Sequence, residues 1–363
     1  MEKKLRRIYF IMTVFILTLA ALYGRWYFNQ KPAVSKVPLA QTLSTKVSSG
    51  RASDEMVYAS GIPIGIYIKT KGVLVLGTQQ IKDSDNRSFS PSAHKLKSGD
   101  YILEMNGQKI QSKKQFLTLL QKNGENEIVL TVLRKNEEQE IKLKPVFSPE
   151  TGSYQIGAWI RNDTQGIGTV TFIRPDGSFA ALGHGINDCD LGVHLDISGG
   201  SVYKTDISAI MKGRAKNPGE IIGSIDYLPE KYLGTIDHNT DGGIFGTIKN
   251  NKSAFQTGDL LPVAPMSEIK KGSASLRTSI SGKSKDYTIK IEKISQNKKN
   301  KLKSLQIQVT DPELLALTGG IIQGLSGSPI IQDGKFVGAV THVFVNDPTK
   351  GYGVTAETML KME

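Results

Sequence analysis

The sequence predicts a mainly β protein with at least two folded units behind an apolar N-terminal helix. At 363 residues the chain is too long for one ordinary domain. Its 37 glycines are about a tenth of the chain, above the typical ~7%, which favours many tight turns. Apolar and polar residues alternate in short segments bounded by glycine or proline, the pattern typical of strands.

Composition and charge exclude several classes of protein. A single cysteine, Cys189, rules out an intramolecular disulfide and a four-cysteine zinc site. The net charge of +12 is concentrated in the first 30 residues and in Lys270 to Lys303, where eleven basic residues face two acidic ones. Because the rest is near neutral, no nucleic-acid partner is predicted. The second stretch predicts a solvated basic hairpin, with an anionic surface partner as the alternative.

Residues 1–29 predict a signal-anchor helix behind a basic cytoplasmic stub. The sixteen residues from Ile8 to Tyr23 carry no charge and follow four basic residues. Extended by Gly24 and the aromatic residues 26–28, the run approaches the ~17–20 residues of a membrane span, so we expect membrane contact through residues 8–24. A cleaved signal peptide is the alternative. Either way, the positive-inside rule places the remaining chain outside the cytoplasm.

Residues 30–60 predict an exposed linker. The segment is rich in Ser and Thr, contains Pro32 and Pro38, and shows no sustained period. Exposed linkers are frequent protease targets.

Residues 61–145 predict a first folded unit that resembles a PDZ domain of bacterial proteases. The resemblance rests on the turn Ser90–Ala93, the step Ser98–Ile102 and the hairpin turn Asn106–Gly107, with a helix over 112–121. It implies an α+β domain that binds an extended or C-terminal peptide as an added strand. The loop receiving the peptide end would be Gly61, Ile62, Pro63, Ile64 and Gly65. The alternative is that these glycines only make turns.

Residues 146–363 predict a second, β-rich unit with a histidine at a strand end. The alternating segment 168–173, the turn 175–177 and the returning segment 178–182 form a hairpin. His184 follows directly between Gly183 and Gly185. Glycines permit backbone conformations that direct such a ring into a cleft. A core or turn histidine is the alternative.

The segment Gly324–Pro329 resembles the nucleophile loop of trypsin-like serine proteases. Such a loop exposes a serine hydroxyl, here that of Ser326. It also directs two backbone N–H groups, those of Gly324 and Ser326, at one point where an oxyanion is stabilised. Histidine before serine is the trypsin-like order, and the resemblance implies a double β-barrel. The alternative is a plain Gly/Ser turn.

The residues alone do not decide which aspartate would orient His184. Trypsin-like enzymes carry it well upstream of the serine, where the candidates are Asp206, Asp226, Asp237 and Asp241. A different candidate is Asp311, fifteen residues before Ser326. A paired carboxylate would raise the histidine pKa above ~6.5.

As a whole the chain resembles the sporulation stage IV protein B signalling peptidases of endospore-forming bacteria. The motifs that carry this are Ala181–Ile186, Asp311–Leu315 and Thr318–Ile330, together with the anchor and the PDZ-like unit. The resemblance implies a serine endopeptidase without a cofactor, whose triad falls on His184, Asp311 and Ser326.

The resemblance also implies a role. The enzyme would be a single-pass protein of the forespore membrane, with its catalytic part in the intermembrane space. It would cleave itself near the N-terminus, within the linker of residues 30–60, and be partly released. It would then cleave a regulatory membrane protein of an intramembrane metalloprotease, which processes a late sigma factor.

Three rival interpretations stay open. A cluster of five residues could suggest a metal site, although it lacks standard ligand spacing, and no metal is predicted. The cluster is His184, Asp188, Cys189, Asp190 and His194. Cys189 could be a thiol nucleophile. The chain could also be a catalytically silent PDZ adaptor with a protease-like fold. His342 is expected to be structural or a wall of the substrate cleft.

Overall fold

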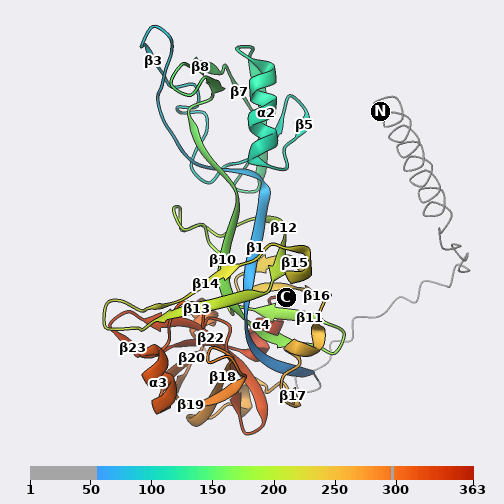
Figure 1. The fold of residues 1–363 in the computed structure, drawn as a ribbon, viewed down its shortest axis with the longest axis vertical. Coiled ribbons are helices and arrows are strands. Elements are labelled where there is room, and N and C mark those ends of the chain that lie inside the picture. The colour runs from blue at the N-terminus through green and yellow to red at the C-terminus, as the bar shows by residue number, and fades with distance from the viewer. Residues whose placement is uncertain (1–54, 296–297) are drawn as a thin grey trace, which may run out of the picture. The chain divides into compact units, whose positions relative to one another are not determined.

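The computed structural model describes residues 55–295 and 298–363. The predicted anchor and residues 30–54 of the predicted linker lie outside these ranges. No helix within the described ranges is long and apolar enough to cross a membrane. The described chain is mainly β, as predicted, and its elements are shown in Figure 1.

Six antiparallel strands form a first closed ring, because β1 pairs with both β10 and β12. Around the ring the strands are β1 (Met56–Thr78), β10 (Ala158–Ile173), β11 (Ser178–Ala181), β16 (Gly243–Ile248), β15 (Tyr232–Thr240) and β12 (Ile197–Tyr203). Alternate apolar side chains, among them Ile64 and Phe179, fill its interior. The predicted turn at 175–177 joins β10 to β11.

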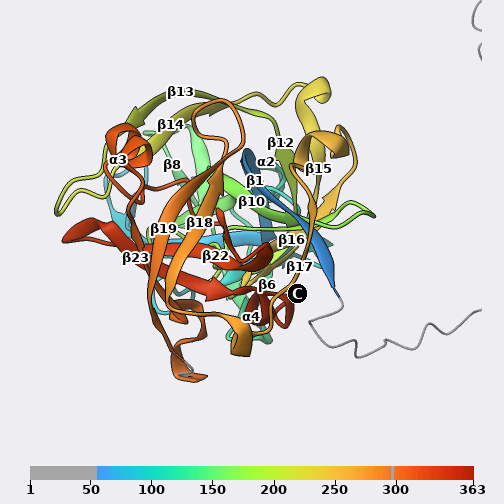
Figure 2. The same cartoon turned by 90° about the horizontal axis from the view of Figure 1, so that it is seen from below.

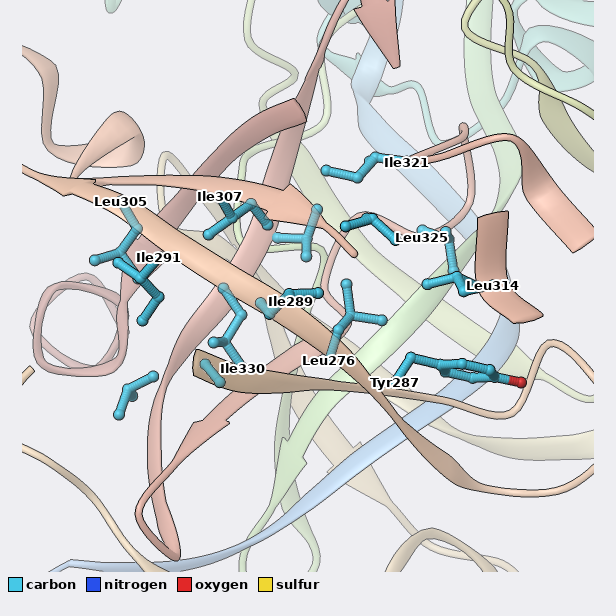
Figure 3. Packing of buried hydrophobic residues seen from close by; sticks show 14 of the residues in the cluster. Leu276, Tyr287, Ile289, Ile291, Leu305, Ile307, Leu314, Ile321, Leu325 and Ile330 are labelled. Carbon is cyan, nitrogen blue, oxygen red and sulfur yellow. The ribbon is translucent and has the colours of Figure 1, made fainter. Parts of the chain in front are cut away.

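A second closed barrel follows in the C-terminal part of the chain. Its strands are β18 (Gly272–Thr278), β19 (Lys285–Ile294), β20 (Leu305–Val309), β23 (Asp347–Thr355), β22 (Lys335–Phe344) and β21 (Pro329–Gln332). Figure 3 shows the core of this barrel, in which Tyr287, Ile289 and Leu276 are completely buried. Two six-stranded rings are the arrangement that the trypsin-like resemblance implies.

The PDZ domain is carried by continuations of two barrel strands. β1 and β10 pair from Tyr58↔Ile173 in the first ring to Thr78↔Ala158 in the PDZ domain, and Figure 1 shows both strands leaving the barrels together. The domain adds β2 (Ile81–Lys82), β3 (Ser88–Phe89), β4 (Tyr101–Met105), β5 (Gln108–Lys109), α2 (Lys113–Asn123), β6 (Ile128–Arg134), β7 (Glu137–Leu143), β8 (Val146–Ser148) and β9 (Ser153–Gln155).

Local sequence explains the helix and the tight turns of the PDZ domain. Ser112 caps α2 by accepting a hydrogen bond from the Gln115 N–H, and Gly124 ends the helix with φ of 63°. The predicted turn between β4 and β5 has positive φ at both Asn106 and Gly107. The turn Ser90–Ala93 leads into further turns.

The remaining elements connect or flank the barrels. The hairpin of β13 (Thr205–Met211) and β14 (Glu220–Ile225) is inserted between β12 and β15. β17 (Leu260–Pro262) pairs with the start of β1. Two short helices, α3 (Pro312–Thr318) and α4 (Ala356–Leu360), stand before and after the last barrel strands, and Figure 2 shows them from below.

The predicted boundary between linker and PDZ domain at residue 61 is wrong. β1 begins at Met56, and its residues up to Thr70 pair with β10 and β12 in the first ring. The PDZ core begins at Val73 and includes Ile156, which lies beyond the predicted last residue of the domain, 145.

Candidate active site

His184 lies three residues beyond the end of β11, where the backbone reverses direction. Leu182 and Gly183 both have positive φ, of 73° and 70°. This conformation suits glycine and strains leucine. At Gly183 a side chain would also approach Thr341 and Val354 of the second barrel. The turn therefore places the His184 ring between the two barrels.

The hydrogen bonding of His184 defines its tautomer. Its Nδ1 lies 2.9 Å from the carbonyl oxygen of Gly185. Since a carbonyl can only accept, Nδ1 carries the proton, and Nε2 is left free to act as a base. Desolvation by the surrounding protein lowers the pKa of His184 below its usual value.

Ser326 lies in a turn held by backbone hydrogen bonds on both sides. The N–H of Gly327 donates to Val340 O at 2.8 Å, and the N–H of Ser328 donates to Leu325 O at 2.9 Å. The Ser326 hydroxyl donates to the carbonyl of Thr341 at 3.1 Å.

The N–H groups of Gly324 and Ser326 find no hydrogen-bond acceptor among the described residues. Gly324 has φ of 96°, and a Cβ there would lie 2.8 Å from the Ile221 side chain. Its carbonyl accepts from the buried Thr169 hydroxyl at 2.7 Å. The turn is therefore fixed by its neighbours, and the two N–H groups for which the motif predicts an oxyanion-binding role are not engaged by other described residues.

One cavity of about 580 Å³ brings these groups together. Its lining includes His184, Gly324, Ser326 and His342. The rings of His184 and His342 are 5.5 Å apart. Desolvation and repulsion from His184 lower the pKa of His342 to about 4, so this second histidine is an uncharged wall of the cavity at neutral pH.

Asp311 is not brought to His184. It is the N-cap of α3, and its carboxylate accepts hydrogen bonds from the N–H groups of Glu313, Leu314 and Thr288. These bonds and the nearby Lys285 lower its pKa despite partial desolvation. No carboxylate oxygen in the described ranges lies within 4.0 Å of a His184 nitrogen. The expected carboxylate that would raise the His184 pKa is thus missing from this arrangement.

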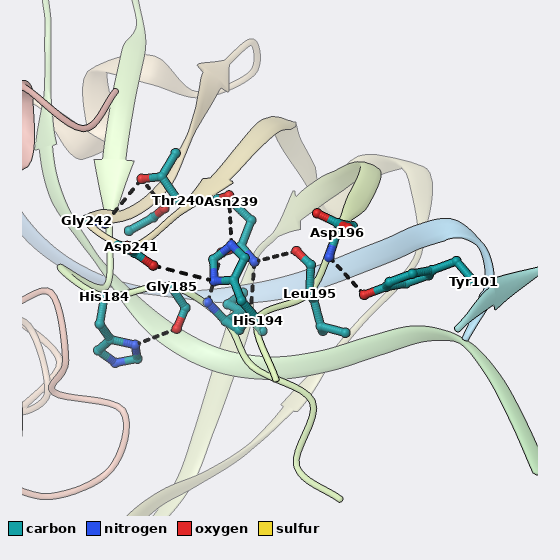
Figure 4. Close-up of polar contacts among 12 residues, drawn as sticks. Tyr101, His184, Gly185, His194, Leu195, Asp196, Asn239, Thr240, Asp241 and Gly242 are labelled. Carbon is teal, nitrogen blue, oxygen red and sulfur yellow. Dashed lines mark hydrogen bonds and ion pairs between the residues drawn. The ribbon is translucent and has the colours of Figure 1, made fainter. Parts of the chain in front are cut away.

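Among the other acid candidates, only Asp241 adjoins the histidine loop. Its carbonyl accepts from the Gly185 N–H at 3.1 Å. Its carboxylate is exposed and lies 4.0 Å from His194 Nδ1. Asp241 therefore supports the loop through its backbone, and its side chain faces a different histidine (Figure 4).

Asn239 is a site residue that the sequence did not single out. Its Oδ1 accepts from the Ile186 N–H at 2.8 Å, and its Nδ2 donates to the carbonyls of Ile186 and Leu195, each at 2.9 Å. Figure 4 shows these bonds beside His184. One side chain on β15 thus holds both ends of the loop that follows the histidine, residues 185–196, which we call the His loop.

The His loop is also packed on the PDZ domain. Leu195, which is 1% exposed, shares a small core with Leu74 and Tyr101. The Tyr101 hydroxyl accepts from the Asp196 N–H at 3.0 Å. The PDZ domain therefore supports the segment next to His184.

The residues that could have suggested a metal site form hydrogen bonds and ion pairs with other residues. Arg161 binds the carboxylate of Asp188 at 2.5 Å and also that of Asp190. His194 Nε2 lies 3.1 Å from Asn239 O. Among the described residues no group of three such side chains could hold a metal ion. Cys189 is exposed at the edge of the same cavity as Ser326.

The segment Gly61 to Gly65 does not form the peptide-receiving loop of the PDZ domain. It lies within β1, paired with β10, and Ile64 is fully buried in the first ring. A different cavity of about 300 Å³ runs between α2 and the start of β10. Leu117 and Trp159 flank it, and Trp159 is 61% exposed.

The chain matches two protein-family models. The SpoIVB peptidase S55 model matches residues 152–360, and the PDZ domain model matches residues 72–144. No curated protein matches the chain significantly.

Solved structures give fold likenesses of low overall similarity. The PDZ domain of the SdrC-like protein from Listeria innocua is 24% identical and covers 25% of this chain and 94% of its own, with a TM-score of 0.21. The active form of the Rv3671c protease from M. tuberculosis is 14% identical, covers 55% of this chain and 73% of its own, and has a TM-score of 0.31. The HtrA-type protease AlgW with a decapeptide is 10% identical, covers 85% and 64%, and has a TM-score of 0.33.

The S55 model spans more than half of the chain, and its range contains both His184 and Ser326. The chain is thus a PDZ-containing serine peptidase and belongs to the SpoIVB peptidase S55 family.

Proposed function

We propose that the protein is a serine endopeptidase in which Ser326 is the nucleophile and His184 the general base. The observation that carries this is one cavity lined by His184, Gly324 and Ser326. The His184 proton lies on Nδ1, and the N–H groups of Gly324 and Ser326 have no acceptor among the described residues. The alternative of a catalytically silent adaptor gives no reason to keep these donors free.

The proposed reaction begins when the Ser326 hydroxyl leaves Thr341 O and turns to His184. His184 Nε2 takes its proton as the oxygen attacks the scissile carbonyl. The N–H groups of Gly324 and Ser326 stabilise the resulting oxyanion. His184 then protonates the leaving amine, and water repeats the sequence to release the acyl group.

In this proposal the Gly185 carbonyl takes the orienting role that a carboxylate has in a triad. It holds the Nδ1 proton and so fixes the tautomer. Asp311, for which the family resemblance implies that role, caps α3. The reacting groups are then a His184–Ser326 pair.

We further propose the biological role that the resemblance implies. The enzyme would be anchored in the forespore membrane by residues 8–24, with its folded part in the intermembrane space. Its substrates would be its own N-terminal region and a regulatory protein of an intramembrane metalloprotease. The groove between α2 and β10, rather than residues 61–65, would bind an extended or C-terminal peptide, since an exposed strand edge beside a helix is how PDZ domains receive one.

A serine-directed fluorophosphonate probe tests the catalytic proposal. We expect the full-length protein to be labelled at Ser326, and Ser326→Ala and His184→Ala to remain unlabelled while keeping their thermal midpoints. His342→Ala is the matched control and should still be labelled. An unlabelled wild-type protein that binds peptides would favour the silent adaptor.

A further inference from the structure

One hairpin tip near the nucleophile loop carries three exposed basic side chains. The β13–β14 tip contains Lys212, Arg214 and Lys216, all exposed. None of these three forms an ion pair with a residue in the described ranges. The Lys216 N–H donates to Val345 O at 2.6 Å, which joins this tip to the β22–β23 tip. Figures 1 and 2 both show the two tips side by side.

The basic surface continues over the outer face of the second barrel. Lys290 and Lys293 are exposed on β19, whereas Ile289 and Ile291, on either side of Lys290, are buried in the core. On the neighbouring strands, the ladder runs from Lys290 through Gln308 to Lys350. Lys303 lies over the Tyr352 ring at 5.0 Å.

We call this surface the basic face. It comprises Lys212, Arg214, Lys216, Lys290, Lys293, Lys303 and Lys350. Three acidic residues lie beside it, and each forms a contact within the protein or is partly buried. Glu292 lies 3.6 Å from Lys350, and Asp347 accepts from the Thr349 hydroxyl. Glu220 is partly buried.

Exposed apolar side chains stand among these cations. Val345 is 57% exposed and Met211 is 39% exposed, one at each hairpin tip. A soluble polyanion would attract the basic side chains but leave both apolar side chains in water. An anionic bilayer surface interacts favourably with both kinds of side chain. Its headgroups attract the basic residues, and the apolar side chains enter the boundary with the acyl chains.

The basic face adjoins the loop that carries the nucleophile. The Gly213 N–H donates to Thr318 O at 2.8 Å, and the Ile321 N–H donates to Pro348 O at 2.7 Å. Both hairpin tips thus support the segment leading to Ser326. We propose that the basic face docks the folded part of the enzyme on an anionic lipid bilayer, through the two hairpin tips, so that the cleft is presented to substrates at the membrane surface.

This docking is separate from the proposed anchor and is tested with the full-length chain. A fluorophore is attached at Val345→Cys in a Cys189→Ser background, and a second labelled protein carries Phe147→Cys on the PDZ domain instead. Vesicles contain either phosphatidylcholine alone or added phosphatidylglycerol, with a headgroup nitroxide quencher. We expect quenching at position 345 only with the anionic vesicles, and little at position 147.

Charge-reversal variants of the β13–β14 tip and of the PDZ domain give a matched comparison. Each basic residue near an anionic surface strengthens binding roughly fivefold. The triple variant K212E/R214E/K216E should therefore weaken quenching at position 345 at least tenfold, as should high salt. The PDZ control K109E/K114E/K122E should leave it unchanged. Thermal midpoints verify that both variants fold.

Equal quenching in neutral and anionic vesicles would overturn the proposal, as would unchanged quenching in the triple variant. If position 345 is never quenched but the triple variant loses cleavage of an acidic protein substrate, the basic face serves a protein partner and membrane docking is wrong. Loss of fluorophosphonate labelling would speak against the peptidase proposal and not against docking.

Discussion

At the scale of single residues, the proposed base His184 has no carboxylate within 4.0 Å among the described residues. Its Nδ1 proton is held by the neighbouring Gly185 carbonyl, and desolvation favours the neutral ring. A base with a lowered pKa stays unprotonated over a wider acidic range, although it is a weaker proton acceptor.

This arrangement predicts the pH dependence of the reaction. Because the folded-state pKa of His184 is lowered, its protonation on acidification occurs below the reference value of ~6.5. We expect kcat/KM of the free enzyme to be constant from neutral pH down to about 6.5 and to fall only below that. The measurement is kcat/KM with a soluble peptide across the pH range. A midpoint above 7 would mean that a carboxylate raises this pKa after all.

Asp311→Asn separates the structural role of Asp311 from the implied catalytic one. Asparagine is also a good N-cap, so its oxygen can still accept from the N–H groups of α3. We expect near-normal kcat and a loss of stability of at most ~1 kcal/mol. Asp311→Ala, which removes the cap, should lower the thermal midpoint further. A folded Asp311→Asn enzyme with kcat reduced ~10⁴-fold would instead place Asp311 in a triad.

At the scale of elements, the His loop is held from two directions. Asn239 on β15 binds both of its ends, and Leu195 and Asp196 rest on the PDZ domain. The position of the base therefore depends on contacts made far away in the sequence.

Asn239→Ala tests the support from β15. The change removes three hydrogen bonds, each worth ~1 kcal/mol, and leaves the Ile186 and Leu195 backbone groups without these partners. We expect kcat to fall at least tenfold with a smaller change in KM, and the pH profile to keep its shape. Asn250→Ala is the matched control, because its amide donates only to Tyr232 O at an exposed site. Equal effects of the two changes would contradict a positioning role for Asn239.

Features of the site that depend on short sequence motifs could be predicted from the sequence, whereas features that depend on distant residues could not. The loop around Ser326 and the strand-end His184 could be predicted because short motifs determine their backbone. The capping role of Asp311 also has a local signal, because Asp311 followed by Pro312 is the signature of a helix start. Asn239 gave no local signal, since it acts on residues 44 and 53 positions away.

The peptide-receiving loop was misplaced for a related reason. Gly61 to Gly65 reads as a loop because of its glycines and proline, yet β1 runs through it for 23 residues. The strand accommodates these residues with irregular pairing between Ala59 and Ile62. A strand shared by two domains leaves no boundary in the sequence.

At the scale of the whole molecule, the PDZ domain and the peptidase cannot be separated cleanly. A fragment starting at residue 146 would lack the part of β1 that pairs with β10 and β12 in the first ring. We expect this fragment to be insoluble, whereas a fragment starting at Glu55 should fold. The comparison is soluble yield and cooperative thermal unfolding. A soluble, cooperatively unfolding 146–363 fragment would show that β1 is dispensable.

The same dependence on β1 narrows where self-cleavage can occur. The predicted region was 30–60, but residues 56–60 lie in β1 and Glu55 binds Arg174 at 2.6 Å. A cut beyond Glu55 would shorten β1 where it pairs with β17 and β10. Active shortened species should therefore begin between residue 30 and residue 55. Mass spectrometry of purified protein identifies these N-termini.

Ser326→Ala should stay full length, because loss of the nucleophile costs ~10⁴–10⁶ in kcat. Added active enzyme should shorten it if one molecule cuts another. Equal shortening of Ser326→Ala alone, in a host without a related protease, would assign the cut to another enzyme.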